Sequence, residues 1–399
     1  MRITIVNRYF VPEPVLVNDI ARWLAEAGHD VQVICSQPSY NPEANVERQP
    51  RRQSVDGVEV RRLTLLPERN RGWARYVNGL LFIVRAAIAV LFGPKTDVVW
   101  STSIPPVLQP FLLRLASAVR SAKFVYFVQD IYPEIAVTMR MVKPGWFTRS
   151  VSAVDQWTVT HSDRVVVLSD DMVDTLRQRS GAEAVSFSKV NNFAMVQNAS
   201  LDAPLQDGPC RFVFAGNMGR FQNLERLVSL FSKIDPNKAV LEFLGEGRMK
   251  AALQEQVTRL GIKNVRFHPI VSPREAATFI GRCNVGVVSL TEGLFRYAYP
   301  SKTFAYLSAG VPILALVESG SQIAKELRER EIGVHIDWSM PEDEQIARLE
   351  ELCATQERLR PMVRERAMDM FDRDRARDRW LAVFASLQHE AAAGELPAT

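Results

Sequence analysis

Cysteine is scarce in this sequence, and its placement excludes several classes of site. The four cysteines stand far apart, and no CxxC pair is present. A zinc ribbon, an iron–sulfur site and a disulfide scaffold are therefore poorly supported, and we expect reduced, buried thiols. A GxGxxG segment is also missing after the first expected strand, which disfavours a classical NAD-binding start.

Long apolar runs are missing as well. The longest, from Gly79 to Gly93, is interrupted by Arg85, whereas a membrane span needs about 20 apolar residues. The first residues read as a strand that begins at Arg2, without the apolar run and cleavage site of a signal peptide. We therefore expect a cytoplasmic protein without a spanning helix.

The composition is that of a globular protein large enough for two domains. Of its 399 residues, 47% are apolar and 24% are charged, which excludes global disorder. The net charge is only +4, but the segment from Arg51 to Ser150 holds 15 Lys or Arg against 6 Asp or Glu. The chain therefore carries a strongly basic stretch in its first half.

That stretch contains basic and aromatic residues directly before an apolar run from Val77 to Phe92; they are Arg69, Arg71, Trp73, Arg75 and Tyr76. This pattern fits an anionic membrane surface, and it fits equally a buried core helix that begins with solvated arginines. No known nucleic-acid motif is present, so we expect no nucleic-acid partner.

Short apolar strands alternate with helical segments in both halves of the chain. We expect strands at Ile3–Val6, Val31–Cys35, Val58–Leu63, Asp97–Ser101, Lys123–Val128 and Arg164–Leu168, and then at Arg211–Ala215, Val240–Leu244, Val265–Phe267, Val285–Ser289 and Pro312–Leu316. This order predicts an α/β protein with two doubly wound, Rossmann-like parallel sheets. Ligands are expected at the carboxyl ends of the strands and in a cleft between the domains.

A polar stretch from Asn191 to Gly208 is the expected linker. It divides the chain into a first domain of residues 1–195 and a second domain of residues 196–374. A C-terminal helix over residues 375–399, with Trp380 and Phe384 at near-helical spacing, is expected to return to the first domain.

In the first domain, the candidate site residues follow predicted strands. Asp130 comes directly after a buried strand, where a carboxylate loses hydration unless it has a partner or a task. It is a candidate acid or base, or a group that binds a ligand hydroxyl; it could equally cap the next turn. Asn18 and Asp19 could contact a substrate, but the start of a helix explains them as well.

In the second domain, ligand-type loops follow four of the five expected strands. They are Gly216-Asn217-Met218-Gly219-Arg220, Gly245-Glu246-Gly247, Ser301-Lys302 and Gly320-Ser321-Gln322. Glycines let backbone amides approach a ligand, and a helix start with a lysine suits a diphosphate. One such loop has little weight, but four at one edge of a sheet predict a nucleotide diphosphate site.

Taken in order, these segments resemble the retaining glycosyltransferases of family four, which have the GT-B fold. The resemblance rests on NRYFVPEP with AGHDV, STSIPP, VQDIYPE, VNNF, FAGNMG, FLGEG and YPSKTFAYLSAGVPILA, from residue 1 to about 340. The matching subgroup is that of bacterial colanic-acid, capsule and O-antigen enzymes, of the WbuB and WcaI type.

The resemblance implies a nucleotide-sugar donor on the second domain, an acceptor on the first, retention of anomeric configuration, and no metal or other cofactor. By this match, Asp130, Arg220 and Lys302 would be the catalytic residues. The remaining assignments are Gly216 and Asn217 at the sugar diphosphate, Ser301 at the phosphates, Gly245, Glu246 and Gly247 near the nucleoside, Gly320, Ser321 and Gln322 as amide donors, and Gln129 beside Asp130 at the donor sugar.

The sequence departs from the family pattern where many relatives carry two glutamates seven residues apart. Tyr297 and Ala305 stand at those places, and Glu292 could replace one of the missing carboxylates. A Lys-Gly pair of the relatives is replaced by Gln222-Asn223, so Arg220 and Lys302 would have to carry the positive charge.

The resemblance and the basic stretch together predict transfer from a nucleotide-diphosphate sugar, with UDP favoured, to a polyprenyl-diphosphate-linked saccharide in surface polysaccharide synthesis. The protein would act peripherally on the inner face of the bacterial inner membrane and contact its anionic surface. Two alternatives stay open: a GT-B-fold epimerase or hydrolase of sugar nucleotides, and a non-catalytic GT-B subunit, which the missing glutamates would suit.

Overall fold

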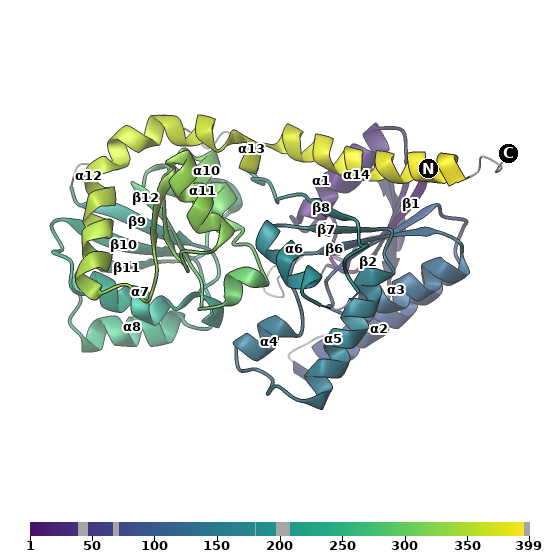
Figure 1. Cartoon of the computed structure of the whole chain (residues 1–399), viewed down its shortest axis with the longest axis horizontal. Helices are drawn as coiled ribbons and strands as arrows, with labels where there is room; N and C mark the ends of the chain where they lie inside the picture. The colour runs from purple at the N-terminus through teal and green to yellow at the C-terminus, as the bar shows by residue number, and fades with distance from the viewer. Residues whose placement is uncertain (39–46, 67–71, 180, 197–207, 395–399) are drawn as a thin grey trace. The chain divides into compact units, whose positions relative to one another are not determined.

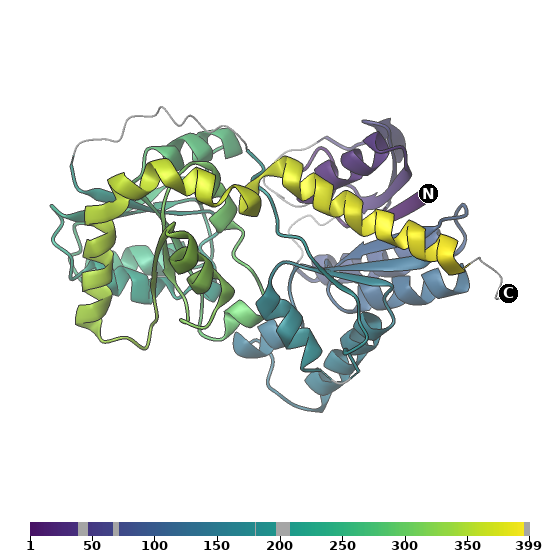
Figure 2. The ribbon, with the colours of Figure 1, turned by 45° about the horizontal axis from the view of Figure 1, so that its top comes forward.

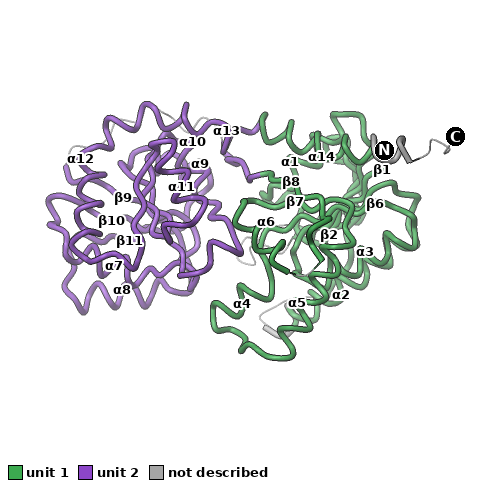
Figure 3. Tube along the Cα trace, viewed as in Figure 1, with its two compact units in different colours: residues 1–190, 374–399 green, residues 191–373 purple. Residues whose placement is uncertain are grey.

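The structure, a computed structural model, describes residues 1–399 except 39–46, 67–71, 180, 197–207 and 395–399 (Figure 1). The chain divides into two compact units, shown in Figure 3. Unit 1 comprises Met1–Val190 and Asp374–Thr399, and unit 2 comprises Asn191–Arg373. Most of the expected linker, residues 197–207, lies outside the described residues.

Unit 1 is built on one eight-stranded sheet. Its strands are β1 (Arg2–Val6), β2 (Asp30–Ser36), β3 (Arg52–Val55), β4 (Val58–Leu63), β5 (Val98–Thr102), β6 (Lys123–Val128), β7 (Arg164–Val167) and β8 (Phe187–Lys189). They lie in the order β3-β4-β2-β1-β5-β6-β7-β8, and all neighbours are parallel except β3 with β4. The strand order reverses between β1 and β5, because the strands that follow β1 are added on one side of it and those from β5 onward on the other. A ligand is expected at the carboxyl ends of β1 and β5.

Helices connect the strands of unit 1 and cover its sheet. They are α1 (Leu16–Glu26), α2 (Gly72–Leu91), α3 (Leu108–Val119), α4 (Glu134–Thr138), α5 (Trp146–Thr160) and α6 (Asp170–Arg177). Ser169 caps α6, because its hydroxyl accepts a hydrogen bond from the amide of Met172. No helix of the described residues has the length and the apolar content needed to cross a membrane.

The C-terminal helix α14 (Arg373–Gly394) packs on the sheet of unit 1, as the sequence predicts (Figure 2). Its Trp380 is 1% exposed, and its ring centroid lies 4.9 Å from that of Trp100 on β5 and 5.0 Å from that of Phe127 on β6. Phe384, one turn later, meets Trp100 edge-on at 6.2 Å. This aromatic cluster fixes the end of the chain to unit 1.

Replacing Trp380 by Ala should destabilise unit 1 by about 3–5 kcal/mol, because the substitution removes a buried aromatic side chain and leaves a cavity. Urea denaturation followed by circular dichroism measures the loss. Trp146→Ala is the matched control, since Trp146 is 75% exposed and its loss should change stability by about 0.5 kcal/mol or less. Equal effects of the two substitutions would contradict the anchoring role of Trp380.

Unit 2 is built on a six-stranded, wholly parallel sheet. Its strands are β9 (Cys210–Ala215), β10 (Ala239–Leu244), β11 (Val265–His268), β12 (Val285–Ser289), β13 (Ile313–Leu316) and β14 (Gly333–Ile336), in the order β11-β10-β9-β12-β13-β14. The order reverses between β9 and β12. The helices are α7 (Leu224–Phe231), α8 (Lys250–Arg259), α9 (Pro273–Gly281), α10 (Lys302–Ser308), α11 (Gln322–Arg330), α12 (Glu342–Arg366) and α13 (Met368–Phe371).

Candidate active site

The loops after β9 and β10 of unit 2 are bound together through their backbones. The amide of Gly216 donates to the carbonyl of Leu244 at 2.8 Å, and the amide of Met218 donates to the carbonyl of Glu246 at 2.8 Å. A Cβ atom at Gly245 would lie 2.5 Å from the carbonyl oxygen of Gly216, and one at Gly247 would lie 2.4 Å from that of Met218. Gly245 and Gly247 are therefore required for this close approach of the two loops.

Lys302 stands at the start of α10, where the strand order of the sheet reverses. Its Nζ lies 4.5 Å from the ring centroid of Phe214 on β9, and a Cβ atom at Gly216 would lie 3.2 Å from that Nζ. Burial alone lowers the pKa of the Lys302 ammonium to about 8, with no carboxylate of the described residues opposing the shift. A poorly hydrated ammonium beside an open glycine loop is a ready site for an anion.

Tyr306 holds the helix that carries Lys302 against the sheet, a role that was not predicted from the sequence. Its hydroxyl accepts a hydrogen bond from the amide of Ala215 at 2.9 Å and donates to the carbonyl of Val287 at 3.2 Å. Tyr306 thereby joins β9 to β12 from α10, and Lys302 lies one helical turn before it on the same face. The only sequence signal is this spacing of four residues.

The side chains of Asn217 and Arg220, in the loop after β9, are exposed. Arg220 opens a short 3₁₀ helix (Arg220–Gln222), which is held by the Gly219 amide donating to Oε1 of Gln222 at 2.9 Å. The amide of Thr291, in the loop after β12, donates to the carbonyl of Phe221 at 2.9 Å. The backbone is thus fixed, while the guanidinium of Arg220 remains available at the carboxyl end of the sheet.

Several other residues expected in the donor site have local partners. Glu246 pairs with Lys250 at 2.6 Å. Ser321 is buried and caps α11 by accepting from the amide of Ala324 at 3.4 Å, and the Gln322 side chain donates to Glu326 at 2.6 Å. In contrast, Glu292, Ser301 and Gly320 are exposed to solvent. Ser301 makes no capping hydrogen bond with its side chain.

In unit 1, Asp130 follows β6 and is half-buried. Its carboxylate has no hydrogen-bond or ion-pair partner among the described residues, and burial raises the pKa of Asp130 to about 6. Burial of the Tyr132 hydroxyl, together with the charge of Asp130, raises the pKa of Tyr132. Gln129 next to it donates its backbone amide to the hydroxyl of Ser103, in the loop after β5, at 3.1 Å. A carboxyl group of this kind can exchange a proton near neutral pH.

A buried ion network holds the segment that follows Asp130. Arg179 donates to Asp155 at 2.6 Å, to Glu134 at 2.8 Å and to the carbonyl of Tyr132 at 3.3 Å. Tyr126 on β6 donates to Asp155 at 2.9 Å. These residues are scattered along the chain, so no sequence pattern marks them, yet they fix the backbone beside Asp130.

Asn18 lies in the first turn of α1. Its side-chain nitrogen donates to the carbonyl of Glu13 at 2.7 Å, and its Oδ1 has no partner in the described part of the chain. Asn18 therefore fixes the loop after β1, which accords with its interpretation as a residue of the helix start.

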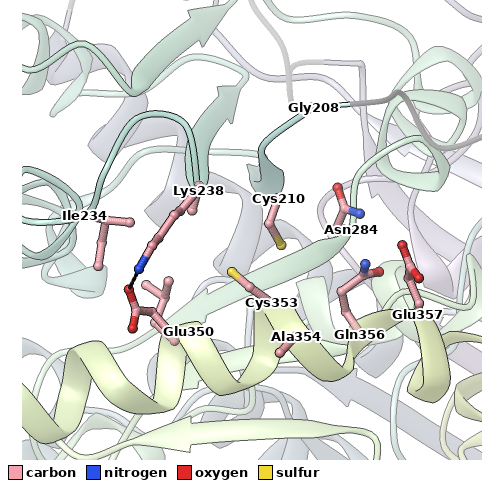
Figure 4. Close-up of a pocket in the computed structure, with 12 residues that line it drawn as sticks. Gly208, Cys210, Ile234, Lys238, Asn284, Glu350, Cys353, Ala354, Gln356 and Glu357 are labelled. Carbon is pink, nitrogen blue, oxygen red and sulfur yellow. Dashed lines mark hydrogen bonds and ion pairs between the residues drawn. The ribbon is translucent and has the colours of Figure 1, made fainter.

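The pocket drawn in Figure 4 is not at the glycine loops of unit 2. It has a volume of about 560 Å³, and it lies where β9 and β10 begin, against α12. Lys238 and Glu350 pair across it at 2.9 Å. Cys210 and Cys353, distant in sequence, point toward each other there (Figure 4), and the hydrogen bond between the two side chains, together with burial, raises the pKa of the Cys210 thiol. Such a thiol stays protonated and unreactive.

The cysteines are free, as expected, although only Cys35 and Cys283 are fully buried. Over the ranges that the structure describes, three or more His, Cys, Asp or Glu side chains nowhere gather as metal ligands would.

Comparison with known proteins supports the resemblance found in the sequence. The family model described as a glycosyl transferase 4-like domain matches residues 15–188. A Pseudomonas aeruginosa protein named as the glycosyltransferase WbjE is 28% identical over 303 residues, which cover 71% of this chain and 72% of that protein. An Escherichia coli protein named as a colanic acid biosynthesis glycosyl transferase, WcaI, is 22% identical over 77% of this chain and 80% of its own length.

Among solved structures, Anabaena HepE in complex with UDP-glucose matches 97% of this chain and 100% of its own, with a TM-score of 0.68 and 13% identity. At that identity the match shows the shared fold. Residues 15–188 therefore match a glycosyl transferase 4-like domain, and the chain has the GT-B fold and is similar over most of its length to bacterial glycosyltransferases.

Proposed function

We propose that the chain transfers a sugar, with retention, from a UDP-sugar to a polyprenyl-diphosphate-linked saccharide during synthesis of a bacterial surface polysaccharide. The names of the relatives support the pathway class, because WcaI is named for colanic acid biosynthesis. The structure of HepE with UDP-glucose supports a UDP-linked donor. In this proposal unit 2 binds the donor and unit 1 binds the acceptor.

The observation that carries the proposal is the uncompensated ammonium of Lys302 beside Gly216. A nucleotide diphosphate leaving the sugar gains negative charge, and a fixed cation in a poorly hydrated place stabilises that charge more strongly than water does. Arg220 would supply the second positive charge. With these two residues the diphosphate is neutralised without a metal ion.

Asp130 is the residue of unit 1 that we propose contacts the reacting groups. With its pKa raised to about 6, the carboxylate is ionised at neutral pH but close to its titration range. It can accept a hydrogen bond or a proton from a sugar hydroxyl. An exposed Ala305 and a half-buried Tyr297 stand where many relatives carry glutamates, and Glu292 is exposed. In this proposal the donor contacts of those glutamates are therefore made differently.

The exposed face of helix α2 supports the proposal that the acceptor is carried by a lipid in an anionic membrane. Phe82, Ala86 and Val90 are buried in the core, so the core-helix interpretation holds for that face. The opposite face exposes a stripe of apolar side chains: Val77, Leu80, Val84 and Ile88. Of the basic residues expected beside it, Arg69 and Arg71 lie outside the described residues. An exposed apolar stripe of this kind suits the membrane interface.

The nucleotide can be tested by thermal denaturation with UDP, GDP, ADP and dTDP. UDP should raise the melting temperature selectively, because binding at a hundred times the dissociation constant stabilises a fold by about 2.7 kcal/mol. Uridine is the matched control, since it lacks the diphosphate that Lys302 and Arg220 would bind. A shift with another nucleotide alone would contradict the UDP assignment, and no shift with any of them would contradict the donor site.

The acceptor can then be tested with the UDP-sugar that shifts the melting temperature most. Transfer to a polyprenyl-diphosphate saccharide, with the donor's anomeric configuration retained by NMR, is the expected result. Release of the sugar to water, or its epimerisation without an acceptor, would instead favour a hydrolase or an epimerase.

A further inference from the structure

A second pocket, in unit 1, is formed almost entirely by arginines and apolar side chains. It has a volume of about 470 Å³ and lies between the β3–β4 hairpin and the C-terminal half of α2. The arginines that line it are Arg51, Arg52, Arg61, Arg62 and Arg85; the apolar residues are Leu63, Ile88, Ala89 and Phe92. No carboxylate of the described residues lines the pocket.

Among the residues that the structure describes, no carboxylate pairs with the arginines of this pocket. Arg52 and Arg61 are direct cross-strand partners in the β3–β4 ladder, a pairing of like charges that destabilises a hairpin. A polyanion or phosphate in the pocket would remove this repulsion.

Some arginines of the pocket are held by hydrogen bonds to backbone carbonyls, and others are exposed. Arg62 is 3% exposed and donates to the carbonyls of Pro50 at 3.1 Å and Val11 at 2.6 Å. Arg85 donates to the carbonyl of Thr64 from α2. These contacts join the hairpin to the rest of the unit, while the exposed Arg51 and Arg52 are left to bind a ligand.

The apolar wall of the pocket continues beyond it. Phe92 is 78% exposed and Ile88 is 50% exposed, and Val84 and Leu80 extend the same exposed stripe along α2. A ligand that satisfies both surfaces has an anionic head and a long apolar tail. Guanidinium groups bind phosphate oxygens in bidentate geometry, which makes a phosphate the fitting head.

We propose that this arginine pocket binds the phosphate headgroup of an anionic membrane phospholipid, with the acyl chain against the exposed face of α2. This site deepens the proposed function, on which it rests for the presence of a membrane. The pocket is distinct from the expected place of the reacting groups, because none of its residues comes from the loops after β1, β5 or β6.

The test compares binding of the full chain to phosphatidylcholine vesicles with and without phosphatidylglycerol. The wild type should bind the anionic vesicles more tightly. The double variant Arg52→Gln/Arg61→Gln should lose about tenfold or more of that binding, because it removes two cations that attract the anionic surface. Its melting temperature should not fall, since the substitutions remove a repulsion.

Arg259→Gln/Lys263→Gln is the matched control, because it removes two exposed cations from unit 2. It should change vesicle binding much less. Equal losses in the two double variants would mean diffuse attraction by net charge and would overturn the pocket; so would unchanged binding of Arg52→Gln/Arg61→Gln. Ile88→Ser should also weaken binding, and an unchanged affinity would overturn the place of the acyl chain.

A separate measurement distinguishes this proposal from the proposed function. The UDP-induced thermal shift should be the same in Arg52→Gln/Arg61→Gln as in the wild type. Selective loss of vesicle binding with an intact UDP shift supports the pocket. Absence of any nucleotide shift in the wild type would contradict the donor assignment while leaving the lipid measurement valid.

Discussion

Replacing Lys302 by Met is expected to lower kcat for sugar transfer by about 100-fold to 1,000-fold, the effect of removing one donor that stabilises transition-state charge. The ammonium lies beside Gly216, where the loops after β9 and β10 meet. No described carboxylate compensates it. Steady-state kinetics with the UDP-sugar that the screen identifies measures the change.

The same substitution should raise stability at neutral pH. Burial lowers the pKa of Lys302 to about 8 from its ordinary value of 10.5, so below pH 8 the folded state carries the full cost of an ammonium that the unfolded chain hydrates better. This cost disappears as the pH rises from 8 to 10.5. Lys302→Met should therefore melt at a higher temperature than the wild type at pH 7, and the difference should vanish above pH 10.5.

Lys325→Met is the control for both measurements, because Lys325 is exposed on α11 of the same unit. It should leave kcat and stability nearly unchanged. A third readout follows from the charge itself: wild-type affinity for UDP should decrease as the pH rises through 8, and Lys302→Met should lack this dependence. Near-normal turnover of Lys302→Met would contradict the proposed role of Lys302 at the diphosphate.

The strongly apolar strands could be predicted from the sequence, whereas three of the four edge strands could not. Strands such as β6 and β12 are buried on both faces and read as continuous apolar runs. The missed strands β3, β8 and β14 have three or four residues and alternate or mixed burial. Missing β3 also hid the arginine pocket, because Arg52 and Arg61 meet only when the hairpin forms.

The position of the candidate site could also be predicted, since ligand loops must follow parallel strands at one edge of the sheet. What each residue does there could not. Gly245 and Gly247 look like donor ligands in sequence, but their hydrogens face the neighbouring loop. Tyr306 and the network of Arg179 with Asp155 and Glu134 depend on contacts between residues far apart in the chain.

Replacing Asp130 by Asn is expected to lower kcat by about 100-fold to 10,000-fold, the range for loss of a positioned acid or base. The UDP-induced thermal shift should persist, because Asp130 belongs to unit 1 and the glycine loops with Lys302 belong to unit 2. Wild-type kcat should decline on the acid side near pH 6, where Asp130 becomes protonated. This acid limb should be absent from the residual activity of Asp130→Asn.

Stability should change in the direction opposite to activity. The pKa of Asp130 is raised from 3.8 to about 6, so the folded state is penalised above pH 6, and the penalty is lost as the pH falls to 3.8. Asp130→Asn should therefore raise the melting temperature at pH 8, whereas Asp56→Asn, at an exposed hairpin position, should not. If Asp130→Asn lowers stability and kcat together, Asp130 is a structural cap; a gain in stability with a loss of turnover identifies a carboxylate retained for chemistry.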